Sequence, residues 1–392
     1  MPGQITRVYP ASGANTMLPL TPANNYEPTV IFCGGTYIPD AGWGNYANIA
    51  INVWEVAASQ DCHRITPEPQ NGSAPVYVQD DNLPVGRTMG QFIHLPDGTI
   101  LLVNGGQWGV AGYAYMTGQT PTFAQMPYGE SIAAGPVLQP LIYNPNAPAG
   151  SRFSAAGLSP STVPRLYHSS AVLLPDGSVM IAGSNPHADV TTNTVFPTTW
   201  TAEYFYPPYF NATTRPAPQG IPDYLSYGGN YFDITLPASS YTGSVDTAAA
   251  NTVVYLIRQG FTTHAMNMGQ RSMQLNNSYT IQPNGTIILH TSQLPPNPNL
   301  FQPGPAFVFV TVNGIPSIGQ WVIVGNGQFG TQPTQQLAVL PVSSNQATAT
   351  NSSSPSTSSS PNKKKNGAIS SHMTAGSTLG LLLTVAMTLV LS

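Results

Sequence analysis

Two segments of the chain, GRTMGQFIHLPDGTILLVNGGQ (residues 86–107) and PRLYHSSAVLLPDGSVMIAGSN (residues 164–185), repeat one pattern. Each has an arginine near its start, a Pro-Asp-Gly turn, an apolar run and then a Gly-Gly or Gly-Ser pair. The turn predicts a hairpin, and the glycines predict a sharp bend where a buried strand ends. PTVIFCGGT (residues 28–36) is a third, partial copy. An arginine followed by a hairpin and a glycine pair is typical of a kelch blade in a β-propeller.

The composition agrees with an all-β protein. The chain has 392 residues with 39 prolines and 37 glycines, and 41% of its residues are hydrophobic. Only 7% are charged, where about 25% is usual. Short runs rich in Val, Ile and Phe end at Gly or Pro, and no segment shows a helical period. The net charge of −4 and the lack of a basic stripe argue against nucleic-acid binding.

The kelch pattern stops near residue 213. A proline-rich junction follows, and evenly spaced short strands then continue to residue 340, as in an immunoglobulin-like sandwich. We therefore predict a partial propeller over residues 1–213, with room for about four blades at 40–50 residues each. A sandwich over 214–340 and a Ser/Thr-rich, O-glycosylated stalk over 341–365 would follow.

The C-terminal residues 366–392 resemble a GPI-attachment signal. A small-residue triplet begins at Asn366, a mostly polar spacer follows, and residues 379–391 are apolar. This apolar run is shorter than the roughly 20 residues that a membrane-spanning helix needs. We expect attachment at Asn366 and an extracellular protein held at the cell surface or wall. Residues 1–10 show no signal peptide, so we expect a truncated gene model.

Cysteines and glycosylation motifs fit an exported protein. Cys33 and Cys62 are the two cysteines of the chain, and they form either one disulfide or a pair of free thiols. Asn-x-Ser/Thr motifs are the candidate N-glycosylation sites; they begin at Asn71, Asn211, Asn276, Asn284 and Asn351.

Three residues stand out as candidate metal ligands. Tyr167 and His168 adjoin at the start of a predicted strand, and His264 follows the predicted strand 253–257. Neighbouring residues in a regular strand point to opposite faces, so one site for both Tyr167 and His168 requires an irregular strand end. The remaining histidines are taken as structural or surface residues, or, for the last of them, as part of the GPI signal; they are His63, His94, His187, His290 and His372.

The motifs resemble those of fungal glyoxal oxidases, copper radical oxidases related to galactose oxidase. The resemblance runs from TRVYPASGANTMLPLTPANNY through DCHRITPE, RLYHSSAVLLPDGSV and FTTHAMNMGQR to IPSIGQWV. It implies the C-terminal blades of a seven-bladed kelch propeller, followed by an early-set immunoglobulin-like domain, with one Cu(II) on the propeller axis. By this resemblance Tyr167 is the axial tyrosine that takes the substrate proton. His168 and His264 are the imidazole ligands, the latter on a hairpin that enters the propeller channel.

The resemblance also implies an activity. Family members oxidise aldehydes such as glyoxal and methylglyoxal to carboxylic acids and reduce O₂ to H₂O₂, which extracellular peroxidases can consume. Their radical cofactor is a Tyr–Cys pair that precedes the segment matching residues 6–13 here. Cys33 and Cys62 match neither role and resemble a structural disulfide. We therefore expect the 392-residue chain to be incomplete and inactive by itself.

Two other functions remain open. A cell-surface propeller module could bind glycans or proteins without catalysis. A copper-carrying surface protein could use the thioethers of Met266, Met268 and Met273, although methionines more often fill cores. The optical spectrum after copper loading and oxidation separates the three, because a tyrosyl radical on copper absorbs into the near infrared.

Overall fold

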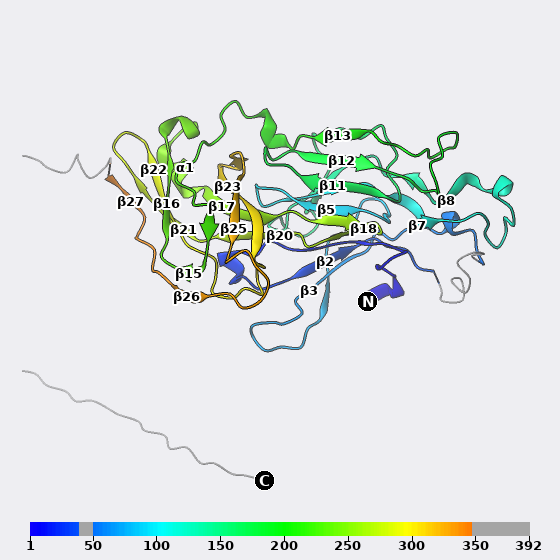
Figure 1. Cartoon of the computed structure of the whole chain (residues 1–392), viewed down its shortest axis with the longest axis horizontal. Helices are drawn as coiled ribbons and strands as arrows, with labels where there is room; N and C mark the ends of the chain where they lie inside the picture. The colour runs from blue at the N-terminus through cyan, green and yellow to red at the C-terminus, as the bar shows by residue number, and fades with distance from the viewer. Residues whose placement is uncertain (39–49, 347–392) are drawn as a thin grey trace, which may run out of the picture. The chain divides into compact units, whose positions relative to one another are not determined.

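The computed structural model describes residues 1–38 and 50–346 (Figure 1). These residues are almost entirely β-structure, with short 3-10 turns and one α-helix, α1 (Val245–Ala250). The sequence predicted no helix; α1 ends in three alanines, which are good helix formers, and Ala248 and Ala249 pack into the core behind it. In the described part of the chain, no helix is long and apolar enough to cross a membrane. The predicted glycosylation site Asn351, most of the stalk and the GPI signal at Asn366 lie outside the described residues.

Three antiparallel sheets of three or four strands are formed by the described residues before position 213. In spatial order, the first sheet has the strands β1 (Ala14–Met17), β2 (Val30–Cys33), β3 (Cys62–Ile65) and β4 (Tyr77–Gln79). The second sheet has β10 (Phe153–Ser154), β9 (Leu141–Tyr143), β6 (Ile100–Val103) and β5 (Gln91–His94). The third sheet has β11 (Ser169–Leu173), β12 (Val179–Gly183) and β13 (Ala202–Phe205). Chain length left room for about four blades, but residues 106–136 form a long two-stranded hairpin, β7 (Gly106–Tyr113) and β8 (Pro127–Pro136).

The two full copies of the repeat are hairpins, as predicted. In β5–β6 the Asp97 carboxylate accepts a hydrogen bond from the Thr99 amide at 3.0 Å, and Asp176 does the same for Ser178 at 2.9 Å in β11–β12. The glycine of each turn has a positive φ, 85° at Gly98, which other residues rarely adopt. The Pro-Asp-Gly chemistry therefore sets both hairpin registers.

The repeated arginine ties the start of each unit to its end. Arg87 donates from Nη1 to the Asn104 carbonyl at 3.1 Å, and Arg165 donates from Nη1 to the Gly183 carbonyl at 2.6 Å. In the first sheet Arg7 donates from Nε to the Gly34 carbonyl at 3.1 Å. The partial copy thus begins earlier than residue 28, with Arg7 in the place of the repeat arginine.

Neighbouring sheets pack face to face. Ile31 and Cys33 of the first sheet share a core cluster with Phe92 of the second. The opposite face of the second sheet, including Leu101, packs against Ile181 of the third. Every residue of β5 and β6 is therefore buried, which explains why ILLV of β6 is a continuous apolar run rather than an alternating one.

His94, in this middle sheet, is expected to make the protein less stable in acid. Its side chain is fully buried, and burial lowers its pKa to about 3. Between that value and the ordinary 6.5 the unfolded chain binds a proton that the folded chain does not, so stability falls as pH falls through this window. Between about pH 6.5 and pH 4.5, the free energy of unfolding should fall by about 2 kcal/mol more in the parent protein than in His94→Gln. Urea unfolding of both proteins at the two pH values checks this, and parallel losses in both would contradict it.

A β-sandwich follows, as predicted. One sheet has the spatial order β14 (Tyr224–Leu225), β25 (Gln320–Val324), β23 (Gly304–Val312), β17 (Thr252–Arg258) and β20 (Arg271–Leu275), with β24 (Ile315–Pro316) paired to β23. The other has the order β16 (Phe232–Leu236), β22 (Ile287–Thr291), β21 (Asn277–Ile281) and β27 (Ser344–Asn345), and a separate pair joins β15 (Tyr227–Gly229) to β26 (Thr334–Leu337). Fully buried residues such as Leu256 of β17 and Leu289 of β22 fill the space between the sheets.

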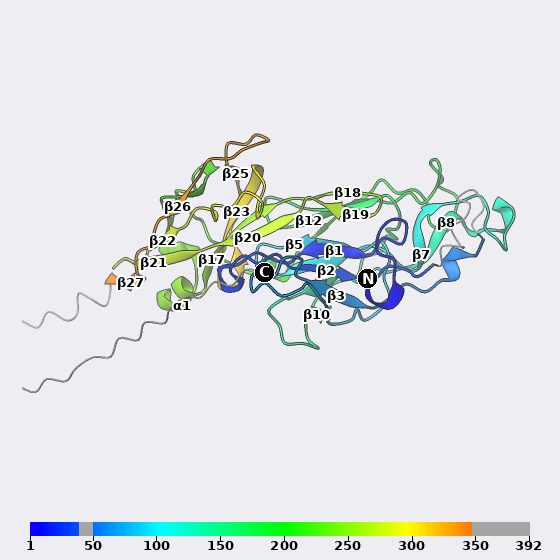
Figure 2. The same ribbon diagram turned by 90° about the horizontal axis from the view of Figure 1, so that it is seen from below.

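Between β17 and β20 the chain leaves the sandwich and forms a hairpin, β18 (Phe261–Thr263) and β19 (Met266–Met268) (Figures 1 and 2). It contacts β1, β5 and β11, the strands that begin the three sheets. Polar side chains fix it there: Asn267 and Gln270 both donate to the Phe92 carbonyl, at 3.0 and 2.8 Å. The Gln270 carbonyl oxygen accepts from the His94 amide at 2.9 Å. The hairpin tip is thereby held against the strand ends of the blades.

Candidate metal centre

Tyr167 and His168 share one side of the backbone because the strand has not yet begun. Both lie in the turn before β11, and His168 has a φ of 64°, in the left-handed region. Their rings stack with centroids 3.9 Å apart. This is the irregular strand end that the sequence required for both residues to serve one site.

A hydrogen bond at one ring nitrogen of His168 leaves the other available as a ligand. Nδ1 lies 2.7 Å from the Asn185 carbonyl oxygen, which can only accept a hydrogen bond. Nδ1 therefore carries the proton, and Nε2 keeps its lone pair. Such a carbonyl partner is the usual way of fixing the tautomer of a metal-binding histidine.

His264 occupies the turn of the hairpin β18–β19. His264 and Ala265 both have positive φ, 53° and 58°, which is the geometry of a tight two-residue hairpin turn. Ser12 donates from Oγ to the His264 carbonyl at 3.2 Å and so anchors the turn to the segment that precedes β1. The turn and its anchor bring His264 to the residues that precede β11.

Tyr167, His168 and His264 meet at one cavity of about 230 Å³. Its other walls are small or hydroxylated residues from the same two segments: Ser169, Ser170, Thr262, Thr263 and Ala265. The three predicted ligands are thus brought together from two distant parts of the chain.

Tyr9 is a site residue that we did not predict from the sequence. Its ring lies edge-on to the His264 ring, with centroids 5.1 Å apart, and 6.1 Å from the Tyr167 ring. Tyr9 follows Arg7, which matches Arg165 in the repeat. If the repeat is taken to begin at Arg7, Tyr9 stands two residues after the repeat arginine, as Tyr167 stands two residues after Arg165. This shared spacing is the signal that could have identified Tyr9.

The phenols of the site affect one another. Burial raises the pKa of Tyr167 above its ordinary value, and a hydrogen bond with Tyr9 and the nearby phenols of Tyr9 and Tyr113 raise it further. Without a cation, Tyr167 is therefore a neutral phenol at neutral pH. A bound divalent cation would favour the phenolate instead.

We expect Tyr9→Phe to lower the pKa of Tyr167 in the metal-free protein, because the hydrogen bond that favours the neutral phenol is lost. The pKa should stay above that of a free tyrosine, since burial is the largest cause. The measurement is an ultraviolet pH titration of the parent protein and of Tyr9→Phe. In each case the titration of the same protein with Tyr167→Phe is subtracted, so that only the signal of Tyr167 remains. An unchanged Tyr167 titration would contradict the expectation.

The donor set fits Cu(II). Two imidazoles with phenol oxygens are the nitrogen and oxygen donors that a tetragonal Cu(II) site prefers. Within residues 1–38 and 50–346, no group of three or more His, Cys, Asp or Glu side chains could hold a metal ion. The Tyr-containing set at the cavity is therefore the candidate.

The other histidines have partners elsewhere. The contacting atoms are the Thr16 hydroxyl for His94, the Phe196 carbonyl for His187, the Asp61 carboxylate for His63 and the Asp233 carboxylate for His290. Met273 is fully buried in the sandwich core, and Met268 is 43% exposed on β19. Met273 is therefore not available for a shared thioether site, and the copper-carrier hypothesis keeps only Met266 and Met268, which both lie on β19.

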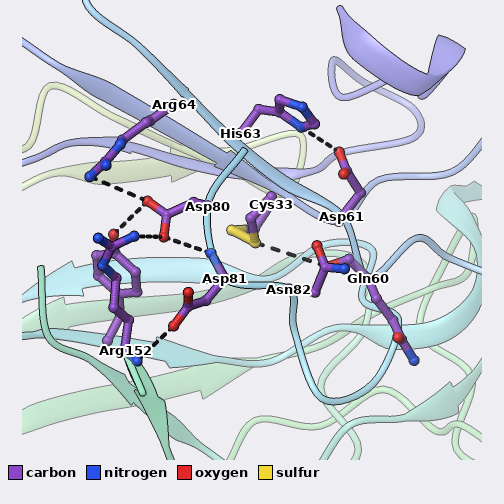
Figure 3. Close-up of a disulfide and its surroundings, with 12 residues drawn as sticks. Cys33, Gln60, Asp61, His63, Arg64, Asp80, Asp81, Asn82 and Arg152 are labelled. Atoms are coloured by element: carbon purple, nitrogen blue, oxygen red, sulfur yellow. Dashed lines mark hydrogen bonds and ion pairs between the residues drawn. A yellow bond between two sulfur atoms is a disulfide. The ribbon is translucent and has the colours of Figure 1, made fainter. Parts of the chain in front are cut away.

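Cys33 and Cys62 form a disulfide between β2 and β3 (Figure 3), and neither of them lines the cavity. Both sulfur-bearing residues are buried in the core between the first two sheets. Beside them Asp80 pairs with Arg152 at 2.6 Å and accepts from the Tyr143 hydroxyl at 2.9 Å. These contacts join the two sheets, and neither cysteine is free for a bond to a tyrosine.

Four of the five predicted glycosylation sites lie in the described residues, and all four are exposed there: Asn71, Asn211, Asn276 and Asn284.

Comparisons with known proteins agree with these features. A family model described as "Glyoxal oxidase N-terminus" matches residues 1–209, and one described as "Galactose oxidase-like, Early set domain" matches residues 215–324. A protein named "Aldehyde oxidase GLOX" from Vitis pseudoreticulata is 33% identical over 321 residues, which are 81% of this chain and 54% of that protein. "Aldehyde oxidase GLOX1" from Arabidopsis thaliana is 31% identical, over 81% of this chain and 48% of that protein. The chain thus spans about half the length of these relatives.

A solved structure described as "Novel fungal alcohol oxidase with catalytic diversity among the AA5 family, in complex with copper" has a TM-score of 0.55 and 20% identity. The match covers 80% of this chain and 54% of that one, and it shows a shared fold. Together with a glyoxal oxidase model that matches more than half of the 392 residues, these findings show that the chain belongs to the glyoxal oxidase family.

Proposed function

We propose that this chain forms part of a copper radical oxidase that acts on small aldehydes such as glyoxal and methylglyoxal. The hydrated aldehyde, RCH(OH)₂, reacts with O₂ to give RCOOH and H₂O₂, so that the carbon loses two electrons and O₂ gains them. The observation that carries the proposal is the meeting of Tyr167, His168 and His264 at one cavity. The family match and the relatives named aldehyde oxidase support it.

Each residue has a role in this reaction. His168 and His264 would hold one Cu(II) through imidazole nitrogens, and Tyr167 would add its oxygen as a phenolate, the form that can accept a proton. Bound copper would supply one-electron redox chemistry and, with a radical partner, a two-electron oxidant. Tyr167 takes the proton of the substrate hydroxyl, and Tyr9, beside both Tyr167 and His264, limits how a substrate can approach that phenol.

We further propose that the Tyr–Cys radical of the family does not use a cysteine of this chain, since Cys33 and Cys62 are joined to each other. The purified chain should then yield little H₂O₂ from methylglyoxal. Fusing it to the part of the Vitis pseudoreticulata relative that lies outside the match should yield copper-dependent H₂O₂. Failure of the fusion, once copper-loaded and folded, would count against the oxidase.

The metal site itself is tested by electron paramagnetic resonance of the copper-loaded chain. We expect a tetragonal Cu(II) signal with two nitrogen ligands, reduced to one nitrogen in either His168→Ala or His264→Ala. A signal that neither variant alters would place the copper elsewhere, and the proposed function would fail.

A second candidate function is binding of glycans without catalysis. Tyr204 and Tyr206 are more than half exposed and line a cavity of about 360 Å³ beside the Arg165–Glu203 ion pair. Exposed aromatic rings beside polar groups suit a sugar ring. Retention on a cell-wall glycan column that Tyr204→Ala abolishes, with no copper signal, would favour this reading.

We also propose that the protein is extracellular and held at the membrane through a GPI anchor at Asn366, with extracellular peroxidases consuming its H₂O₂. The exposed glycosylation motifs support an export route. Release of the protein from intact cells by a phosphatidylinositol-specific phospholipase tests the anchor.

A further inference from the structure

Gln91 places an amide in the core, at the start of the strand β5. Its side chain is only 1% exposed, and Phe92 and Ile93, which follow it, are apolar and buried as well. A buried amide lowers stability unless hydrogen bonds replace those it made with water. Both ends of the Gln91 amide have such a bond. The partners in these two bonds therefore show what the residue holds in place.

Both partners of Gln91 line the cavity of the candidate metal centre. Nε2 donates to the Ser169 carbonyl at 2.9 Å, and Oε1 accepts from the Thr262 hydroxyl at 3.4 Å. The orientation of the amide is fixed, because a carbonyl oxygen can only accept a hydrogen bond. Ser169 directly follows His168, and Thr262 stands two residues before His264. One buried side chain thus bonds to both segments that carry the imidazoles.

The other contacts of these two segments each hold one of them. Ser12 bonds to the His264 carbonyl, and the Asn185 carbonyl accepts from His168. Among the residues that the structure describes, the side chain of Gln91 is the one that hydrogen-bonds to both segments, 167–170 and 262–265. The strands agree with this placement, because β11 contacts both β5 and β18 (Figure 1). Gln91 is therefore a direct bridge across the back of the cavity.

The two imidazole-bearing turns have backbone that needs such support. His168 has a φ of 64° and His264 a φ of 53°, values that residues other than glycine rarely adopt. Strained backbone of this kind persists only where the surrounding contacts hold it. If the two turns took the metal-binding arrangement only part of the time, the apparent metal affinity would fall by that fraction.

We propose that Gln91 is a positioning residue whose amide sets the separation of the turns bearing His168 and His264, so that the metal site is formed before a metal binds. This rests on the proposed function, in which these two histidines hold Cu(II). Gln91 does not line the cavity, and it acts through Ser169 and Thr262 rather than on metal or substrate.

The first test replaces the amide by an apolar side chain of similar length, in Gln91→Met. We expect the Kd for Cu(II), measured by competition with a chelator, to rise about tenfold, the lower end of the range for residues that orient a metal ligand. The electron paramagnetic resonance signal should broaden, because the imidazoles no longer keep one arrangement. Gln332→Met is the matched control. Gln332 is 7% exposed, its amide donates to the Gln328 carbonyl at 2.8 Å, and it does not line the cavity.

The second test removes the other half of the bridge and does not depend on the folding of Gln91→Met. Thr262→Val keeps the shape of the side chain and loses its hydroxyl, so the Kd for Cu(II) should rise about threefold, as for one neutral hydrogen bond. Thr262→Ser keeps the hydroxyl and should bind Cu(II) as the parent does. Added to Gln91→Met, Thr262→Val should change the Kd by less than about twofold, because its partner is already gone.

The outcomes separate the bridge from the proposed function. Weaker Cu(II) binding in Gln91→Met and Thr262→Val, with parental binding in Thr262→Ser and Gln332→Met, supports the proposal. Parental binding in both Gln91→Met and Thr262→Val, or equal losses in Gln91→Met and Gln332→Met, overturns it and leaves the oxidase standing if His264→Ala still weakens copper binding. Copper binding that ignores His264→Ala as well shows that the proposed function has failed, and the positioning role fails with it.

Discussion

Replacing His264 by alanine is expected to weaken Cu(II) binding by more than about a hundredfold. Loss of a residue that merely orients a ligand typically costs 10–100-fold in metal affinity, so loss of a direct ligand should exceed that range. The hairpin turn itself should survive, because its backbone is held by Ser12 and by the contacts of Asn267 and Gln270. Competition with a chelator of known Cu(II) affinity gives the constant.

His290→Ala is the matched control for this prediction. It also removes one imidazole, but His290 lies in the sandwich and pairs with Asp233 at 2.7 Å. Its Cu(II) affinity should equal that of the parent protein. Equal losses in the two variants would mean that copper binds without regard to the cavity.

Removal of the disulfide, by Cys33→Ala together with Cys62→Ala, is expected to lower the free energy of unfolding by about 3–4 kcal/mol. The bond closes a loop with a sequence separation of 29 residues, and opening it gives the unfolded chain more freedom. The two small side chains add a packing loss, because both cysteines are fully buried. Urea unfolding with a linear extrapolation measures the difference.

The Cu(II) affinity of the folded double variant should be unchanged, because neither cysteine lines the cavity. Reduction of the parent protein should reproduce the stability loss, apart from the packing loss. A variant that keeps its stability but loses copper would contradict the separate roles assigned to the disulfide and the cavity.

These two predictions assign stability and copper binding to different parts of the molecule. The disulfide joins β2 to β3 within the first sheet, and the Asp80–Arg152 ion pair links that sheet to the second (Figure 3). The turn before β11 and the tip of β18–β19 carry the candidate chemistry. The relatives named aldehyde oxidase are about twice as long as the matched region, and their activity is carried over to this chain as a proposal.

The sequence by itself determined the local elements. The Pro-Asp-Gly turns set the hairpins β5–β6 and β11–β12, because a turn needs only its own few residues to form. The adjoining Tyr167 and His168 required an irregular strand end, and the structure has one. The sandwich was predictable from evenly spaced apolar runs for the same reason, since strand patterning is a local property.

Only the tertiary structure decided what meets at the site. His264 lies far from Tyr167 in the chain, and side-chain contacts of Asn267 and Gln270 with Phe92 bring the hairpin β18–β19 to the blades. Residues 106–136 became a braced hairpin instead of another blade because their partners lie in other segments, such as Pro10 and Phe196. Tyr9 reaches Tyr167 and His264 through such contacts. No local pattern encodes them, because they depend on how separately formed sheets pack against one another.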